Sequence, residues 1–131
     1  MKKFNQLIRK IVKLEDCVPY PGGYTGEKSQ WRRNKSPMYP KIRLSLEKVG
    51  MINPLWVFLE EDGTYRIVKG SCRAVAWYDM GKKDVEVLIA PLGMDRKQAN
   101  ALFRNSDFIE NIFMIDPKTG EFLSEKFPKG F

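Results

Sequence analysis

The stretch Lys69-Gly70-Ser71-Cys72-Arg73-Ala74-Val75-Ala76-Trp77 joins an expected strand to an expected helix and decides the fold. Gly70 lets the backbone turn closely, and Ser71 is a good N-cap residue, so the first helical amides are expected to point outward. Such amides attract anions, and the Arg73 guanidinium could add a bidentate contact to a phosphate oxygen. The pattern predicts a phosphate-binding corner at Gly70, Ser71, Cys72 and Arg73. The alternative is an ordinary strand-to-helix turn with a solvated arginine.

Regular elements are predicted on both sides of this corner. Ile42, Leu46 and Val49 fall on one helical face ahead of Gly50, and Asp62-Gly63 is a hairpin turn. The expected strands cover residues 7–14 at a sheet edge, 55–59, 64–68 and 85–90, and the expected helices cover 39–49, 72–80 and 95–105, the last capped by Asp95. A short helix around Phe108, Ile109 and Ile112 and an irregular tail over 116–131 complete the chain. The order predicts an α+β fold in one domain of the 131 residues.

A basic segment precedes the expected helix at 39–49. Pro19, Pro21, Gly22 and Gly23 predict irregular structure, so residues 19–40 are expected to form a long basic loop. The formal net charge of the chain is +7, which favours polyanionic partners. Basic side chains interleaved with an aromatic ring can grip phosphates and stack on bases, which makes candidate nucleic-acid contacts of Trp31, Arg32, Arg33 and Lys35. A solvated loop that keeps the protein dissolved is the alternative.

Residue types that are absent or far apart narrow the chemistry. Histidine is absent, which excludes Ser-His-Asp triads, Cys-His pairs and histidine-ligated metals. Cys17 and Cys72 make no C-x-x-C pair, so neither a zinc site nor a disulfide framework is indicated. The chain has no membrane-spanning apolar run and no signal peptide, and it is expected to be soluble and cytoplasmic.

An ordered set of motifs resembles the ParB/sulfiredoxin superfamily. Gly50-Met51-Ile52-Asn53-Pro54-Leu55-Trp56-Val57 matches the "G-(apolar)-x-x-P-(apolar)-x-V" segment of the ParB branch, and Gly70–Ala76 matches its "G-x-x-R-x-x-A" box. Gly81–Val87 follows as "G-x-x-x-V-x-V", and Glu110-Asn111 corresponds to the "E-N" box. The resemblance covers about residues 11–116. It implies a ParB/sulfiredoxin-like small mixed sheet with packed helices in a single compact domain over 1–115, followed by the tail.

The resemblance also implies roles for particular residues. The Gly70–Arg73 corner would hold the phosphates of a nucleoside triphosphate such as CTP or ATP, and Asn53 would border the base pocket. Glu110 and Asn111 would hold Mg²⁺ with hard oxygen ligands. A carboxylate, Glu110 or Asp107, could then act in catalysis, as the acceptor of a hydroxyl proton in a kinase or as part of a metal-dependent nuclease.

Departures from the family pattern limit these roles. Cys72 stands where ParB proteins carry a second arginine, and Phe113-Met114 follows the "E-N" box in place of a polar residue and an arginine. The catalytic cysteine position of sulfiredoxin holds Ser71, so repair of sulfinic acid is not expected. No helix-turn-helix segment follows, so a complete chromosome-partitioning clamp is not expected either.

Two functions therefore remain open. The first is a stand-alone nucleotide-binding domain that uses Mg²⁺ in a DNA-related process, by phosphoryl transfer, nuclease or NTPase activity. The resemblance makes such a small domain suit a phage or mobile element, in which case it would act in the host cytoplasm. The second is a non-catalytic DNA- or partner-binding module whose nucleotide site has decayed.

Overall fold

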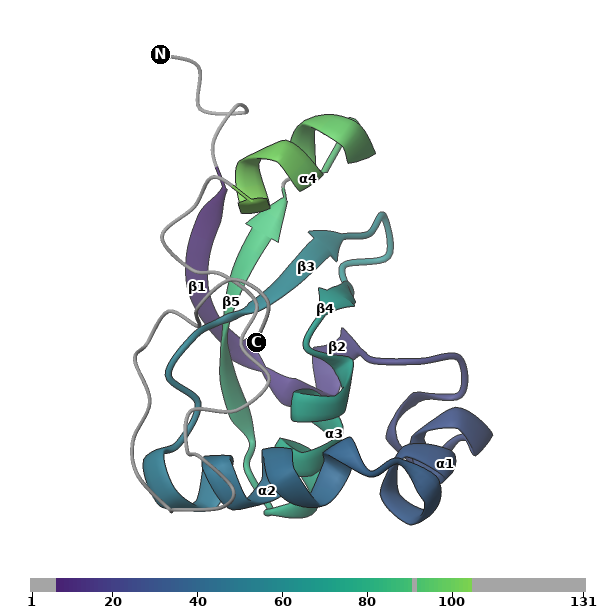
Figure 1. Ribbon diagram of the computed structural model, residues 1–131. Helices are drawn as coiled ribbons and strands as arrows, with labels where there is room; N and C mark the ends of the chain where they lie inside the picture. Colours follow the sequence, from purple (N-terminus) through teal and green to yellow (C-terminus); the bar gives the residue numbers. More distant parts are fainter. Residues whose placement is uncertain (1–6, 91, 105–131) are drawn as a thin grey trace.

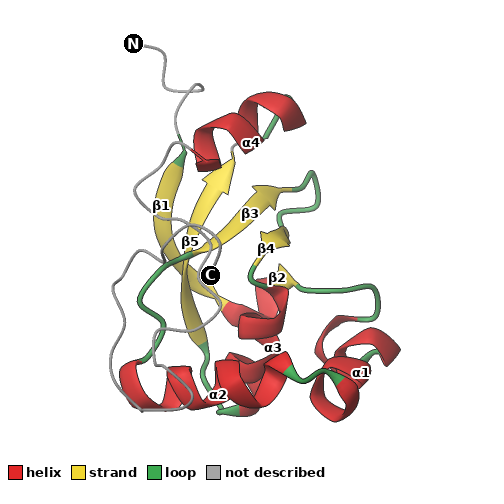
Figure 2. Ribbon diagram, in the orientation of Figure 1, coloured by secondary structure: helices red, strands yellow, loops and turns green. Residues whose placement is uncertain are grey.

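The computed structural model describes residues 7–90 and 92–104. In chain order its strands are β1 (Ile8–Lys13), β2 (Cys17–Val18), β3 (Leu55–Leu59), β4 (Tyr65–Lys69) and β5 (Asp84–Ala90). The helices are α1 (Glu27–Lys35), α2 (Met38–Val49), α3 (Ser71–Asp79) and α4 (Arg96–Arg104), with short 3-10 turns at Leu14–Asp16 and Gly23–Thr25. Figures 1 and 2 show α4 at one end of the sheet and α1, α2 and α3 toward the other.

The five strands form one mixed sheet in the order β1-β5-β3-β4-β2. β3 and β4 are the predicted antiparallel hairpin, and β3 pairs in parallel with β5. In the hairpin turn, Asp62 Oδ1 accepts hydrogen bonds from the Thr64 amide at 2.9 Å and the Thr64 hydroxyl at 2.6 Å. β1 lies at the sheet edge, as predicted, and pairs antiparallel with β5.

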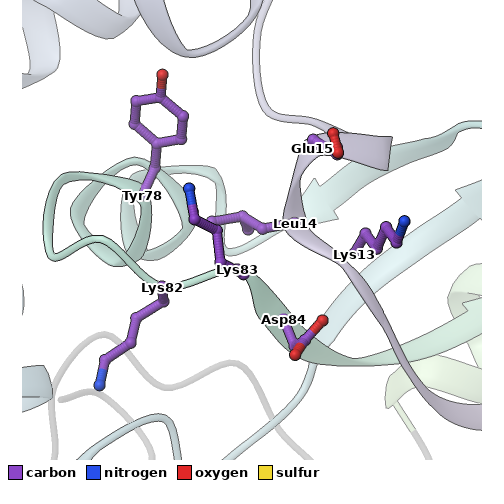
Figure 3. A pocket seen from close by; sticks show the side chains of 7 residues that line it. All are labelled: Lys13, Leu14, Glu15, Tyr78, Lys82, Lys83 and Asp84. Carbon is purple, nitrogen blue, oxygen red and sulfur yellow. The ribbon is translucent and has the colours of Figure 1, made fainter.

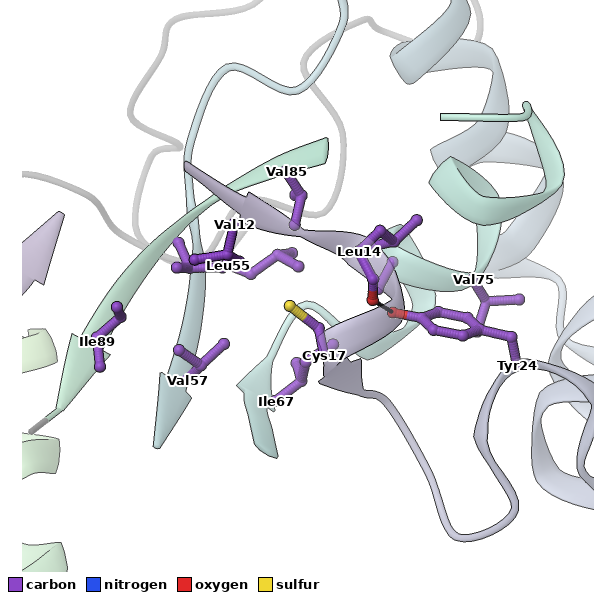
Figure 4. Close-up of a cluster of buried hydrophobic side chains, with 12 residues drawn as sticks. Val12, Leu14, Cys17, Tyr24, Leu55, Val57, Ile67, Val75, Val85 and Ile89 are labelled. Atoms are coloured by element: carbon purple, nitrogen blue, oxygen red, sulfur yellow. Dashed lines mark hydrogen bonds between the residues drawn. The ribbon is translucent and has the colours of Figure 1, made fainter. Parts of the chain in front are cut away.

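Both faces of the central strand β3 are buried, because helices cover the sheet on each side. Leu55 and Val57 belong to the main core, which Ala74 and Val75 of α3 cover. Figure 4 shows this core, including the Tyr24 hydroxyl that donates to the Leu14 carbonyl at 3.1 Å. On the opposite face Trp56 stacks on Phe103 of α4, with ring centroids 5.0 Å apart. A smaller cluster joins α2 to α3 through Ile42, Leu46 and Ala76.

The predicted loop over 19–40 is wrong in its central part, where residues 27–35 form α1. The helix lacks an apolar stripe, and Trp31 on it is 50% exposed, so no periodic pattern marks it in the sequence. Polar contacts hold it: Ser29 Oγ donates to the Gly23 carbonyl at 2.6 Å, and Arg33 pairs with Asp79. The two-residue strand β2 was not predicted.

The other elements agree with the sequence to within a residue or two. α2 begins at Met38, and α3 begins at Ser71. Asp95 caps α4 as predicted, since its Oδ2 accepts from the Lys97 amide at 3.0 Å and the Gln98 amide at 3.4 Å. The short helix expected near 108–112 and the tail over 116–131 lie outside the described residues. Among the helices described, none has the length and apolar character needed to cross a membrane.

Candidate functional site

The corner between β4 and α3 is built as a tight backbone turn. Gly70 has a φ of +103°, in the left-handed region that glycine adopts without strain. A Cβ at this position would lie 2.6 Å from Leu55 Cδ2 and 2.8 Å from Arg73 Nη2. The glycine is therefore required both by its dihedral angle and by the space around it.

The prediction that Ser71 caps the helix is wrong. The N-cap position is Gly70, and Ser71 is the first residue of α3. The Ser71 hydroxyl instead donates to the Pro19 carbonyl at 2.9 Å, which ties the corner to a segment 52 positions earlier in the chain. Because a helix cannot satisfy its first amides internally, the first turn of α3 keeps the donor character expected for anion binding.

Arg73 lies beneath the corner. Its side chain is buried, with 5% of the residue exposed. Its Nη1 donates to the Asn53 carbonyl at 2.8 Å and lies 3.3 Å from Met51 Sδ. The structure thus brings together Arg73 and Asn53, two of the residues predicted for a nucleotide site, through the backbone of Asn53. The arginine supports the turn as well as adding positive charge under it.

A cavity of about 350 Å³ opens over this corner. α1 contributes Arg32 to its wall, and the end of β4 contributes Lys69. The remaining lining comes from the loop before α1, from α2, from β4 and from the corner itself: Tyr20, Met38, Ile42, Val68, Gly70, Ser71, Cys72 and Arg73. Three cationic side chains therefore share one cavity with several apolar ones.

Arg32 lies near two aromatic rings at this cavity. Its Nε donates to the Tyr20 hydroxyl at 2.9 Å. Its guanidinium carbon lies 5.8 Å from the centre of the Tyr20 ring and 5.4 Å from that of Trp31. Burial raises the pKa of Tyr20, and the nearby Arg32 opposes this rise. The hydroxyl therefore stays protonated at neutral pH.

Cys72 also lines the cavity. Burial raises the pKa of its thiol, and the positive charge of Arg32 offsets part of that rise. A thiol with a raised pKa is a poor nucleophile at neutral pH, because the thiolate is the reactive form.

The candidate nucleic-acid residues all lie on α1 but differ in exposure and contacts. Arg32 lies at the cavity, whereas Arg33 pairs with Asp79 at 2.8 Å and its side chain is only 16% exposed. Trp31 and Lys35 are exposed on α1. Both arginines therefore have partners within the fold, Arg32 in Tyr20 and Arg33 in Asp79, while Trp31 and Lys35 are exposed to solvent.

The predicted catalytic and metal-binding residues Asp107, Glu110 and Asn111 lie outside the described residues. Within 7–90 and 92–104, no group of three or more His, Cys, Asp or Glu side chains is arranged to hold a metal ion.

A second cavity, of about 530 Å³, lies where β1 and the α3–β5 turn meet (Figure 3). It is lined by Lys13, Leu14, Glu15, Tyr78, Lys82, Lys83 and Asp84. Figure 3 shows Lys82 and Lys83 projecting to opposite sides. Cations and carboxylates are mixed there, whereas the lining of the Gly70 cavity includes no carboxylate among the described residues.

Sequence reasoning found the corner but missed part of its wall. Tyr20, Met38, Ile42 and Lys69 were not among the candidate site residues, although each lines the cavity. Lys69 adjoins the glycine motif and could have been included on that ground. Tyr20 and the α2 residues carry no local pattern that connects them to a corner some 30 to 50 positions later.

Comparison with known proteins bears on the fold. No protein-family model matches the chain. No curated protein matches it either. Among solved structures, it resembles the C-terminally truncated chromosome-partitioning protein ParB from Caulobacter crescentus, complexed with CTP-γ-S, with a TM-score of 0.50 and 18% sequence identity. The similarity covers 77% of this chain and 56% of that ParB chain. The described α+β domain therefore has a ParB-like fold.

Proposed function

We propose that this ParB-like domain binds a nucleotide through its phosphates at the Gly70 cavity and acts in a DNA-related process. The observation that carries the proposal is the cavity itself, which Arg32, Lys69 and Arg73 line together with the first residues of α3. Phosphates are polyanions, and helix N-terminal amides together with arginine and lysine side chains favour them. That a ParB of this fold is complexed with CTP-γ-S supports CTP as a candidate, with ATP as another.

The remaining lining suits the nucleoside part of such a ligand. Tyr20, Met38, Ile42 and Val68 give the cavity an apolar side, and its volume lies in the range of small-molecule sites. Gly70 lets the chain turn tightly from β4 into α3, which places the first amides of α3 beside the cavity. Asn53 would act by accepting the hydrogen bond that holds Arg73 under the phosphates.

Mg²⁺ is part of the proposal through Glu110 and Asn111, whose side-chain oxygens are the donors that this hard cation prefers. The ion would supply neutralising charge to the phosphates. If the domain is catalytic, Glu110 or Asp107 would accept a proton from the attacking hydroxyl or water in phosphoryl transfer, nuclease or NTPase chemistry.

The test is calorimetry and thermal denaturation with CTP, ATP, ADP and GTP, each with and without Mg²⁺. Wild type is compared with Arg32→Ala and with Arg104→Ala, which removes the same charge from an exposed position on α4. We expect a nucleotide to raise Tm by mass action, with affinity about tenfold lower in Arg32→Ala and unchanged in Arg104→Ala. Arg73→Ala is a poorer probe, because emptying a buried arginine site destabilises the fold directly.

If no nucleotide raises Tm or gives a binding heat in the wild type, the nucleotide proposal is refuted. Equal loss of affinity in the two arginine variants would instead indicate general electrostatic attraction rather than a site at this cavity.

A nucleic-acid-binding module is the second candidate, favoured by the exposed Trp31 beside the Arg32 guanidinium on α1. An exposed indole with cations around it can stack on an unpaired base while the cations contact phosphates. We expect single-stranded DNA to quench tryptophan fluorescence with an affinity that falls steeply with salt and weakens in Trp31→Ala. Arg104→Ala should change this binding little, because it removes an exposed positive charge from α4 rather than from α1. Absence of quenching, or quenching unaffected by Trp31→Ala, would exclude this candidate.

A further inference from the structure

Asp79 is the last residue of α3, and a single oxygen of its carboxylate holds two other helices. Arg33 Nε of α1 donates to Asp79 Oδ2 at 2.8 Å, and the Tyr39 hydroxyl of α2 donates to the same oxygen at 2.5 Å. Arg43 Nη1 donates to the Tyr39 hydroxyl at 3.3 Å, which extends the network along α2. The hydrogen bond to Asp79 raises the pKa of Arg33.

The position of Asp79 is unfavourable for α3 considered alone. A carboxylate at a helix C-terminus faces the negative end of the helix dipole, where a cation would be stabilising. A residue that opposes the local preference points to a role in tertiary structure or function. The side chains of Arg33 and Asp79 are only 16% and 19% exposed, so solvent screens this pair less than a surface ion pair.

α1 depends on such polar contacts for its place in the fold. Of its nine residues, all of them described, only Ser29 is buried. With no apolar face packed into the core, the helix is held by polar contacts, which include the Ser29–Gly23 and Arg32–Tyr20 hydrogen bonds and the Arg33–Asp79 pair. Loss of the carboxylate charge should therefore loosen α1 more than it loosens the rest of the domain.

α1 reaches both ends of α3. Arg33 contacts Asp79 at the last residue of α3, while the neighbouring Arg32 lies at the Gly70 cavity beside Cys72, at the first turn of α3. The two side chains leave the same helix at adjacent positions, so fixing one restricts where the other can lie. Asp79 is not among the described residues that line the cavity.

We propose that Asp79 is a positioning residue for the ligand site: by fixing α1 through Arg33, with Tyr39 bound to the same oxygen, it holds Arg32 at the cavity where phosphate would bind. This inference rests on the proposed nucleotide function. A positioning role can be distinguished from a purely structural role of Asp79. If Asp79 positions Arg32, then removing Asp79 changes ligand affinity only when Arg32 is present.

A double-mutant cycle tests this route. The affinity for CTP with Mg²⁺, or for whichever nucleotide the wild type binds best, is measured in wild type, Asp79→Asn, Arg32→Ala and the double variant. Glu47→Gln is the matched control, since it removes a carboxylate charge from an exposed pair with Arg43 on α2. We expect Asp79→Asn to weaken binding about tenfold in the wild-type background and not at all in the Arg32→Ala background, and Glu47→Gln to change nothing.

Hydrogen exchange of the ligand-free proteins gives a second readout that needs no nucleotide. Amides of residues 27–35 should exchange at least about tenfold faster in Asp79→Asn than in wild type, with no such change in Glu47→Gln. The lowered Tm expected for Asp79→Asn should persist in the Arg32→Ala background, because stability does not depend on the ligand site.

Equal weakening of binding by Asp79→Asn in both backgrounds would overturn the positioning role and leave a structural one. If the hydrogen-exchange rates of α1 are the same in Asp79→Asn and in wild type, Asp79 does not hold α1, and the proposal is overturned whatever the binding data show. If the wild type binds no nucleotide, the proposed function fails and the coupling fails with it, while exchange still decides whether Asp79 holds α1.

Discussion

At the scale of single residues, the tightest constraint is at Gly70. Its φ of +103° and the 2.6 Å and 2.8 Å distances from a hypothetical Cβ to Leu55 and Arg73 act at the same place. The first is a backbone restriction, whereas the second is a packing restriction. A comparison of two glycines separates them, because Gly81 has a φ of +81° with nothing within 4 Å of the same hypothetical atom.

We predict that Gly70→Ala lowers the free energy of unfolding by about 3 kcal/mol, from left-handed backbone strain together with overlap in the core. Gly81→Ala should lower it by only about 1 kcal/mol, from the backbone term alone. Urea denaturation of the two variants and the wild type measures the difference. Equal losses would show that the core gives way at Gly70 and that packing does not require the glycine.

At the scale of elements, the entry to α1 depends on close contact between backbone segments. Gly26, the N-cap residue of α1, has an ordinary φ of −71°, so its dihedral angle does not require glycine. A Cβ there would nevertheless lie 2.8 Å from the Pro21 carbonyl oxygen and 2.9 Å from the Gly22 backbone. The turn over 21–26 thus closes only because a side chain is missing.

We predict that Gly26→Ala lowers Tm and increases hydrogen exchange of α1, since the backbone atoms it meets cannot rotate away as a side chain could. Gly63→Ala, in the β3–β4 hairpin turn, is the control, because it has open space around its hypothetical Cβ but a φ of +88°. It should lower Tm without a selective effect on α1. Exchange that rises equally across the domain in Gly26→Ala would contradict the local explanation.

At the scale of the whole molecule, the core contains ionisable groups whose deprotonation destabilises the folded protein. Burial raises the pKa of the Cys17 thiol from its ordinary value of 9.0 to about 12, and it raises the pKa of the buried Tyr24 as well. Above pH 9 the unfolded chain releases the Cys17 proton while the folded chain keeps it. Unfolding is therefore favoured progressively as the pH rises.

We predict that the stabilisation from neutral Cys17 is fully present below pH 9 and is lost progressively between pH 9 and 12. Cys17→Ala should be less stable at neutral pH, because it removes a buried side chain, yet its stability should fall less steeply with alkaline pH. Urea titrations at intervals from pH 8 to 11 give the two slopes. Parallel slopes would show that Cys17 does not contribute to the alkaline loss.

The sequence predicted most of the regular structure, because those elements carry local patterns. Asp62-Gly63 marks the hairpin, Gly70 and Gly81 bound α3, and Asp95 caps α4. The polar helix α1 was missed because its ion-pair partner lies 46 positions away. The strand order could not be predicted either, since no local pattern in β3 indicates that it will pair with β5 and β4.

For the candidate site, the corner and its basic character followed from the glycine, serine and arginine at 70, 71 and 73. The burial of Arg73 did not, because it depends on the Asn53 carbonyl 20 positions earlier. The Ser71 hydroxyl likewise finds its acceptor at Pro19, where no cap rule would look. Local motifs thus located the site, and long-range contacts decided how each side chain is used.

The edge position of β1 bears on how the chain acquires its fold. Its ladder partner is β5, and Arg9 on β1 pairs with Glu86, 77 positions further along the chain. During synthesis β1 thus emerges long before the strand that completes it, whereas the β3–β4 hairpin and α3 can form from neighbouring residues. The last closure of a long loop is entropically costly, so pairing of β1 is expected to be a late folding step. Until then the Val12 side chain, which is buried in the folded domain, and the unpaired backbone edge of β1 would be available to chaperones or to another nascent chain.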